Sequence, residues 1–333
     1  MNKFPNGQPP LSFIQSLNPL NRDTEKRKFM FDPLYNPQFL YQQRIEDSDL
    51  RRYGVASKKY MDIAESILKN TIKKFETESE FLKQAEGELL EKDALMTIIR
   101  SYLKDNNIEN RVRTQFVHQS VSLASMNGDM LSIRTPIGER TKRAIGMLHH
   151  EIGTHFFRRL NEEKQPWFKN RVGFGFASYY QTEEGLASLH SHMFLEHPIL
   201  WFPALYYYMV FKSQTLSFSE LNEDIKQFVD DRERRWNMCV RVKRGMDDTS
   251  QPGGFVKDQL YLTGIIQVLE WLKENHYDPR PLYQGKLALD DLKKAQQINP
   301  GYVPLLPAFL NEGAPYKENI LRLIKVNGLD AIE

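Results

Sequence analysis

The sequence is organised around the stretch LHHEIGTH (148–155), in which two histidines stand five residues apart and a glutamate follows the first of them. This HExxxH pattern is one residue longer than the HExxH motif, in which two histidines of one helix bind zinc and the glutamate acts as general base. Two imidazoles and a carboxylate are the usual ligands of a catalytic zinc, which keeps one position for water. The stretch therefore predicts a metal centre at His150 and His155, with Glu151 placed to accept a proton from the water.

The five-residue spacing also predicts the shape of the helix that carries the histidines. On a regular helix, residues i and i+5 point about 140° apart, so His150 and His155 would face different directions. A π-bulge adds one residue to a turn and brings the two side chains back onto one face, and such bulges favour functional sites. Gly153 lies within the interval, where the lack of a Cβ eases distortion. We therefore expect a helix over 141–159 with a bulged or overwound turn at 152–154.

A second acidic stretch, TEEGLA (182–187), follows the histidine motif. Thr182 could cap a helix whose first turn holds Glu183 and Glu184, where negative charge suits the helix dipole. In a chain with an HExxxH motif, the same glutamates are also candidates for a third metal ligand from a second helix. The residues alone leave both roles open.

Composition describes an ordinary soluble protein of 333 residues, with a formal net charge of +2 and 41% hydrophobic residues. This balance does not indicate nucleic-acid binding. The single Cys239 excludes an intramolecular disulfide and suits a reducing compartment. The start of the chain has no apolar run typical of a signal peptide, and the most apolar segment, 199–211, is too short to span a bilayer. We expect a cytoplasmic protein without a nucleic-acid or membrane partner; the sequence predicts no oligomeric state.

The remaining pattern predicts a mainly helical α+β fold. Residues 1–30, rich in Asn, Pro and charge, are expected to form a flexible tail, and 31–330 a single domain. Helical spacing runs over 60–75, whereas 111–117 and 130–134 are typical of strands. A small antiparallel sheet beside the metal-binding helix would be a zincin-like arrangement, in which a strand can hold an extended peptide.

Longer motifs carry a family resemblance. From about residue 31 to near the C-terminus the sequence resembles the microtubule-associated tyrosine carboxypeptidases, with these motifs in the family's order: FDPLYNPQF (31–39), HHEIGTH (149–155), QPW (165–167), TEEGLASLHS (182–191), RW (235–236), CVRVKRG (239–245), DTSQPG (248–253) and KDQLYL (257–262). Members of this family remove the C-terminal tyrosine of α-tubulin. They use a zinc ion held by the HExxxH histidines and a downstream glutamate.

The resemblance implies Zn²⁺ as the cofactor, His150 and His155 as ligands, and Glu151 as general base. A related bacterial branch has Gln-Glu-Gly-Leu-Ala at the acidic turn, which favours Glu184 over Glu183 as the third ligand. The implied function is a zinc-dependent carboxypeptidase that removes a C-terminal residue, as in α-tubulin detyrosination, by Glu-assisted attack of zinc-bound water. Residues 31–330 would be its catalytic metallopeptidase domain, and the cytoplasmic protein would be associated with microtubules.

Two further groups of residues are expected at such a site. A tetrahedral oxyanion needs hydrogen-bond donors besides the metal, and Tyr261 and Lys257 belong to a polar motif that opens an otherwise apolar helix. A carboxypeptidase must also bind a free carboxylate. The candidates for that role are Arg241 and Arg244, which share a helix face, and Lys243, which points elsewhere. The alternative for both groups is that they are solvated helix residues.

Other features are open to more than one interpretation. The aromatic loop 174–180 could form a pocket for an aromatic terminal side chain or belong to the core. His149, His190 and His192 are expected to be structural residues or, at most, hydrogen-bond partners within the site. The alternative function is a metal-binding regulatory or interaction protein of the same fold with little peptidase activity. The intact Glu151 argues for the enzyme, because a degenerate site would most readily lose its base.

Overall fold

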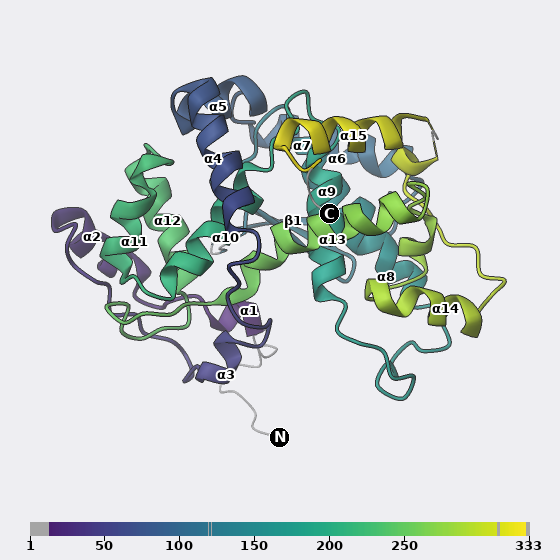
Figure 1. Ribbon diagram of the computed structural model, residues 1–333, viewed down its shortest axis with the longest axis horizontal. Helices are drawn as coiled ribbons and strands as arrows, with labels where there is room; N and C mark the ends of the chain where they lie inside the picture. The colour runs from purple at the N-terminus through teal and green to yellow at the C-terminus, as the bar shows by residue number, and fades with distance from the viewer. Residues whose placement is uncertain (1–12, 119, 121, 312–313, 331–333) are drawn as a thin grey trace. The chain divides into compact units, whose positions relative to one another are not determined.

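The computed structural model describes residues 13–118, 120, 122–311 and 314–330 (Figure 1). Its chain folds into two compact units, one comprising Met1–Lys58 and Tyr208–Asp258 and the other Lys59–Tyr207 and Gln259–Glu333. Both units are largely helical and the second also holds a small sheet, so the mainly helical α+β fold class is confirmed. The single catalytic domain expected over 31–330, and its zincin-like character, stay predictions.

The first unit is a set of helices around an aromatic core. Phe29 packs against Phe218 and Trp236, with ring centroids 5.2 Å apart in each pair. The stretch expected as a tail, 1–30, holds helix α1 and most of α2; residues 1–12 lie outside the described residues. The elements of this unit are α1 (Phe13–Ser16), α2 (Arg22–Phe31), α3 (Asp47–Leu50), α11 (Phe218–Asp224), η3 (Ile225–Gln227), α12 (Arg232–Lys243) and η4 (Val256–Asp258).

The second unit contains the histidine motif and the acidic stretch. Helix α10 (Trp201–Ser213) continues from it into the first unit. Its helices and helical turns are α4 (Met61–Phe75), α5 (Glu78–Phe81), η1 (Leu82–Glu86), α6 (Lys92–Asp105), α7 (Ala144–Leu148), η2 (His149–Phe156), α8 (Phe157–Glu162), α9 (Tyr180–His192), α13 (Gln259–Glu274), η5 (Arg280–Tyr283), η6 (Leu289–Asp291), α14 (Leu292–Ile298), η7 (Ala308–Leu310) and α15 (Ala314–Asn327).

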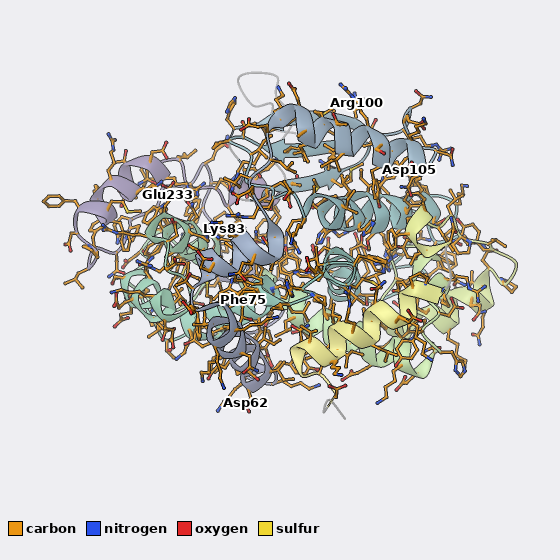
Figure 2. The ribbon with its side chains drawn as sticks, turned by 90° about the horizontal axis from the view of Figure 1, so that it is seen from above. Asp62, Phe75, Lys83, Arg100, Asp105 and Glu233 are labelled. Atoms are coloured by element: carbon orange, nitrogen blue, oxygen red, sulfur yellow. The ribbon has the colours of Figure 1, made fainter. Side chains whose placement is uncertain are left out.

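Helix α4 confirms the helical spacing that the sequence shows over 60–75. Its buried face includes Ala64, Ile67 and Leu68, which recur at the three- and four-residue intervals of one helix stripe. Asp62 and Phe75 mark the two ends of the helix in Figure 2. The helix ends where Glu76 adopts a positive φ of 69°.

The sheet has three strands, and their order differs from the expectation. β3 (Met130–Arg134) lies between β1 (Arg113–Val117) and β2 (Ala124–Asn127), parallel to β1 and antiparallel to β2. The predicted antiparallel sheet is therefore wrong for the β1–β3 pair, and β2 was not expected as a strand. After β1 the chain runs to the far edge of the sheet, where it forms β2. It then turns back, and β3 takes the middle position between β1 and β2.

Helix α9 lies at the centre of the second unit, and each of its residues from 182 to 192 is buried. One of its neighbours is α13, which crosses it at a pair of glycines. A Cβ on Gly185 would lie 2.1 Å from the carbonyl carbon of Gly264, so the backbones touch at this point. The glycine of the acidic stretch is thus required by close helix packing.

Among the described residues, no helix combines the length and the apolar character that crossing a membrane requires.

Candidate metal centre

The histidine motif forms a π-helix, η2, between the α-helices α7 and α8. Each π turn holds one residue more than an α turn, so side chains five residues apart return to the same side. The rings of His150 and His155 accordingly lie face to edge, with centroids 4.8 Å apart. The distortion expected at 152–154 is confirmed, and it extends over the whole of His149–Phe156.

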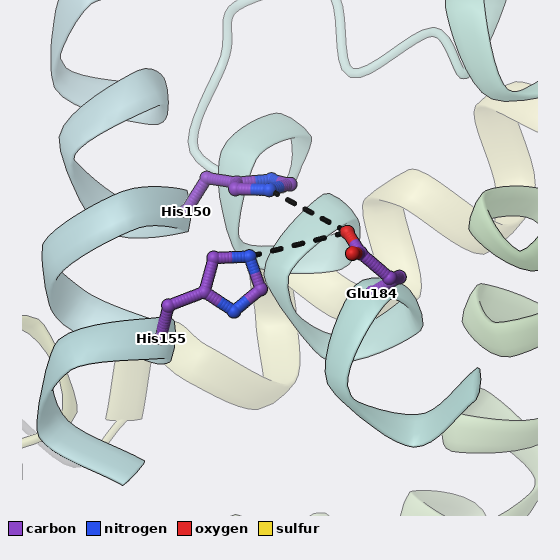
Figure 3. A group of neighbouring side chains, drawn as sticks. All are labelled: His150, His155 and Glu184. Atoms are coloured by element: carbon purple, nitrogen blue, oxygen red, sulfur yellow. Dashed lines mark ion pairs between the residues drawn. The ribbon is translucent and has the colours of Figure 1, made fainter. Parts of the chain in front are cut away.

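The structure brings Glu184 of α9 next to these two histidines (Figure 3). Its Oε2 lies 4.0 Å from Nε2 of His150 and 3.9 Å from Nε2 of His155. All three ligand atoms lie within 4.8 Å of one another. The side chains of His150, His155 and Glu184 are 20%, 15% and 12% exposed, so the group is largely enclosed yet open to solvent.

The group fits a zinc ion by its chemistry and spacing. Two imidazole nitrogens and one carboxylate oxygen form a catalytic zinc ligand set with a further position left open. Ligands about 2.0–2.2 Å from a tetrahedral ion lie about 3.4 Å apart, so binding would draw the Glu184 oxygen and each histidine nitrogen together by about half an ångström. Other divalent ions that accept nitrogen and oxygen ligands fit the same set.

Helix α9 begins earlier than the sequence suggested, and this decides where the glutamates lie. The helix starts at Tyr180, so Thr182 is not its cap; the Thr182 hydroxyl instead accepts a hydrogen bond from the Leu289 backbone N–H at 3.2 Å. Glu183 and Glu184 are therefore consecutive residues inside the helix. Consecutive helical side chains point about 100° apart, so the two carboxylates approach the histidines from different directions.

Glu183 supports His155 from behind, a role that sequence reasoning missed. Its Oε1 lies 2.8 Å from Nδ1 of His155 and 2.9 Å from Nζ of Lys286, and its Oε2 accepts a hydrogen bond from the fully buried Arg158. A histidine that gives its Nδ1 hydrogen to a carboxylate keeps the Nε2 lone pair for a metal. The only signal for this role in the sequence was the presence of two adjacent glutamates.

Charge within this cluster fixes the protonation of Glu183. Burial by itself would raise the pKa of its carboxyl, but Lys286, Arg158 and His155 together hold that pKa well below its ordinary value. Burial likewise opposes the charged form of His155, but the hydrogen bond and charge of Glu183 raise its pKa overall. Zinc at this site would therefore compete with a proton for Nε2.

Glu151 lies beside the same group and is held by the sheet. Its Oε2 accepts a hydrogen bond from the backbone N–H of Met126 in β2 at 2.8 Å. Its Oε1 lies 3.9 Å from Nε2 of His150. The strand that the sequence did not reveal thus orients the predicted general base, because one carboxylate oxygen is anchored while the other faces the histidine.

Of the predicted carboxylate-binding residues, Lys243 lies in the core. It is fully buried, and its Nζ donates to the carbonyl oxygens of Leu216 and Gln251 at 2.6 and 2.9 Å. Burial lowers its pKa to about 8. The structure corrects the expectation for this residue, since its ammonium satisfies backbone carbonyls instead of facing a substrate.

Arg241 lies in α12, but Arg244 follows the last residue of that helix in a non-helical conformation, so the predicted shared helix face is not formed. Both side chains nevertheless meet Asp258. Arg241 donates to both carboxylate oxygens of Asp258 at 2.7 and 3.0 Å, and Nη2 of Arg244 lies 3.6 Å from Oδ1. Their role in binding a substrate carboxylate stays a prediction. So does the role of the proposed oxyanion donors: Tyr261 is half-buried in the first turn of α13, and Lys257 lies in η4 with its Nζ 6.0 Å from the Tyr53 ring centre.

His149, His190 and His192 are buried, as structural residues would be, whereas the pocket suggested for the aromatic loop stays a prediction. The His149 ring packs against Phe309 and Phe194, with centroids 4.2 and 5.0 Å away, and burial lowers its pKa to about 4. In the loop, Phe176 packs edge-on against Trp167, which is fully buried. His192 pairs with its own helix, and His190 hydrogen-bonds to the histidine motif itself.

Fold and site together define a helix-rich α+β protein with a candidate metal centre made by a π-helix and its neighbouring helix. The family model described as microtubule-associated tyrosine carboxypeptidase matches residues 40–317. The chain belongs to this family, which confirms the resemblance seen in the motifs.

Curated relatives agree with this assignment. Mouse microtubule-associated tyrosine carboxypeptidase 1 is 35% identical over 329 residues, covering 96% of this chain and 70% of the relative. The human protein of the same name is 35% identical over 327 residues, with 96% and 69% covered. Mouse putative tyrosine carboxypeptidase MATCAP2 is 35% identical over 330 residues, with 97% and 63% covered.

Proposed function

We propose that the protein is a zinc-dependent carboxypeptidase that removes a C-terminal residue from a protein tail. The observation that carries the proposal is the convergence of His150, His155 and Glu184, whose ligand atoms lie within 4.8 Å of one another, next to Glu151. The names of the relatives support tyrosine as the residue removed, and their association with microtubules makes a cytoskeletal, cytoplasmic substrate such as α-tubulin the candidate.

The chain's own residues would divide the work as follows. A zinc ion bound by the three ligands would polarise the scissile carbonyl and lower the pKa of water towards about 7. Glu151, held by the Met126 N–H, would accept the water proton and would later return it to the leaving amine. His155 would keep Nε2 directed at the ligand group because Glu183 holds Nδ1.

A carboxypeptidase must bind the terminal carboxylate of its substrate and stabilise the oxyanion that forms during hydrolysis. Arg241 and Arg244 are proposed to bind the terminal carboxylate, and Tyr261 and Lys257 to donate hydrogen bonds to the oxyanion. The alternative function, a metal-binding regulatory protein with little hydrolysis, is disfavoured by the presence of Glu151 and by its anchoring to β2.

Hydrolysis of defined peptides tests the proposal. Peptides with an acidic tail ending in tyrosine are incubated with zinc-loaded protein, and the products are weighed by mass spectrometry. Matched peptides carry a C-terminal amide in place of the free carboxylate. We expect loss of the terminal residue from the free peptide alone, and the reaction should stop on addition of a chelator.

The variant Glu151→Gln should lower the rate by about 10²- to 10⁴-fold while metal content stays unchanged. Glu163→Gln serves as the matched control, because Glu163 pairs with Arg159 on the surface. Cleavage within the peptide, or equal cleavage of the amide, would contradict a carboxypeptidase. Stoichiometric metal without any hydrolysis would favour the regulatory alternative.

A further inference from the structure

Behind the candidate metal centre, a chain of buried hydrogen bonds links the π-helix to three other elements. Thr154 Oγ1 bonds to the His149 carbonyl oxygen at 2.9 Å and to Nδ1 of His190 at 2.9 Å. Nε2 of His190 lies 3.0 Å from the Tyr316 hydroxyl. The Tyr283 hydroxyl donates to the Gly153 carbonyl oxygen at 2.8 Å and lies 3.5 Å from Nδ1 of His190. None of these contacts takes part in the reaction described above.

The donors and acceptors of this chain run in one direction. The Thr154 hydroxyl hydrogen goes to the His149 carbonyl, which can only accept, so Thr154 must accept from Nδ1 of His190. Burial keeps the pKa of His190 well below its ordinary value, so the ring is neutral and its Nε2 accepts from Tyr316. In this arrangement Thr154, His190 and Tyr316 each have a buried hydrogen-bond partner.

The Thr154 contact is particular to the π-helix. In an ordinary α-helix a buried threonine hydroxyl reaches the carbonyl four residues back, as Thr71 does with Ile67 at 2.7 Å in α4. Thr154 instead reaches five residues back, to His149. Tyr283 meets the carbonyl of Gly153, midway between the two histidine ligands. The Thr154 contact therefore favours the widened turn over a regular one, and the Tyr283 contact ties that turn to η5.

The chain also sets the distance between the two helices that carry the ligands. Thr154 is adjacent to His155, and His190 lies on α9, the helix that carries Glu184. Thr154 and His190 are both fully buried, as is Tyr283. A hydrogen bond between η2 and α9 in a water-free interior is hard to replace, so it holds the histidines and the glutamate in one register.

We propose that Thr154, His190 and Tyr283 are positioning residues, which hold the π turn in the geometry where His150 and His155 converge with Glu184. The inference rests on the proposed function only in taking His150, His155 and Glu184 as metal ligands. It predicts that removing these hydrogen bonds weakens metal binding by the folded protein, beyond any loss of general stability. If the residues were merely structural, their substitution would lower stability without changing the metal affinity of the molecules that remain folded.

Metal affinity of matched threonine variants tests this role. Thr154→Val keeps the shape of the side chain and removes its hydroxyl, Thr154→Ser keeps the hydroxyl, and Thr71→Val removes the equivalent contact from a regular helix. Zinc affinity is measured by competition with a chromophoric chelator, and ligand geometry by the visible absorption spectrum of the cobalt-substituted protein. Circular dichroism verifies that each variant is folded under the conditions used.

We expect Thr154→Val to weaken zinc binding by about 10- to 100-fold and to change the cobalt spectrum, as loss of groups that orient metal ligands generally does. Thr154→Ser should restore both, and Thr71→Val should leave both unchanged. Tyr283→Phe should act in the same direction as Thr154→Val. In metal-free protein, amide hydrogen exchange within 149–156 should rise in Thr154→Val alone among the threonine variants.

The outcomes separate this inference from the proposed function. Wild-type affinity and spectrum in folded Thr154→Val would overturn the positioning role while leaving the peptidase proposal standing. An equal loss in Thr71→Val would overturn it as well, since the effect would then be one of general stability. Wild-type protein that binds no divalent metal would overturn the proposed function and this inference with it. Metal binding without hydrolysis would leave the positioning role supported by the affinity data.

Discussion

His155 donates a hydrogen bond from Nδ1 to Oε1 of Glu183 at 2.8 Å, and Arg158 and Lys286 meet the same carboxylate. The neighbouring Glu184 faces Nε2 on the other side of the ring. Two adjacent glutamates thus have different tasks, one holding the histidine and one completing the candidate ligand set. The separation arises because consecutive residues of α9 point in different directions.

Glu183→Gln should weaken both the fold and the site. The change leaves Arg158 and Lys286 without their buried counter-charge, and we expect the free energy of unfolding to fall by about 3 kcal/mol. The Nδ1–H of His155 also loses its charged acceptor, since a neutral amide oxygen would stand in place of the carboxylate, so zinc affinity should fall by about 10- to 100-fold. Urea unfolding and chelator competition measure the two effects. Glu163→Gln, on the surface, is the control, and equal behaviour of the two variants would refute the assigned role.

Gly185→Ala should destabilise the protein although alanine is the better helix former. The added Cβ would lie 2.1–2.4 Å from backbone atoms of Gly264, so α13 must move away from α9. Such overpacking costs about 1–3 kcal/mol, whereas alanine gains about 1 kcal/mol in helix propensity. Backbone atoms cannot rotate out of the way as a side chain can, so we expect a net loss of stability. Metal binding at Glu184 should also weaken.

Gly301→Ala is the control for this change, because nothing lies within 4 Å of a Cβ at Gly301. Thermal unfolding of the two metal-free variants gives the comparison. A Gly185→Ala protein as stable as wild type would show that the two helices do not approach as closely as described.

Asp258 should make stability depend on acid pH. Burial by itself would raise the pKa of this carboxyl, but Arg241 and Arg244 outweigh it and lower the pKa to about 2, from an ordinary value of 3.8. A lowered pKa contributes stability that is present above about pH 4 and is lost as the pH falls towards 2. The contribution at neutral pH is about 2 kcal/mol. Urea unfolding between pH 6 and pH 2.5 should therefore show a smaller loss of stability in Asp258→Asn than in wild type; equal slopes would contradict the ion pairs.

Lys243→Met should affect stability and not substrate affinity. The ammonium donates hydrogen bonds to buried carbonyl oxygens, including those of Leu216 and Gln251. Without this donor the carbonyls are left unpaired, and the free energy of unfolding should fall by about 1–3 kcal/mol. The KM for a peptide ending in tyrosine should be unchanged in the folded variant. Lys226→Met, at an exposed lysine paired with Glu223, is the control. A raised KM with unchanged stability would return Lys243 to the substrate site.

The sequence by itself determined the features that depend on neighbouring residues. The five-residue interval between His150 and His155 required a widened turn if both were to face one ion, and η2 has it. Periodic apolar residues predicted helix α4, and the strand predicted over 130–134 is β3 with the same bounds. These inferences succeeded because helix geometry and strand alternation are set by residues only a few positions apart.

Tertiary structure decided the rest, because it depends on segments distant in the chain. Strand β3 lies between β1 and β2, an order that no local pattern specifies. Lys243 is buried because backbone carbonyls far along the chain meet its ammonium. Glu183 turns to His155, Arg158 and Lys286 while Glu184 faces the histidines, although both are the same residue type at adjacent positions. The environments of Glu183 and Glu184 differ only once α8, α9 and the segment after η5 are packed together. That packing makes Glu183 the support of His155 and Glu184 the candidate ligand.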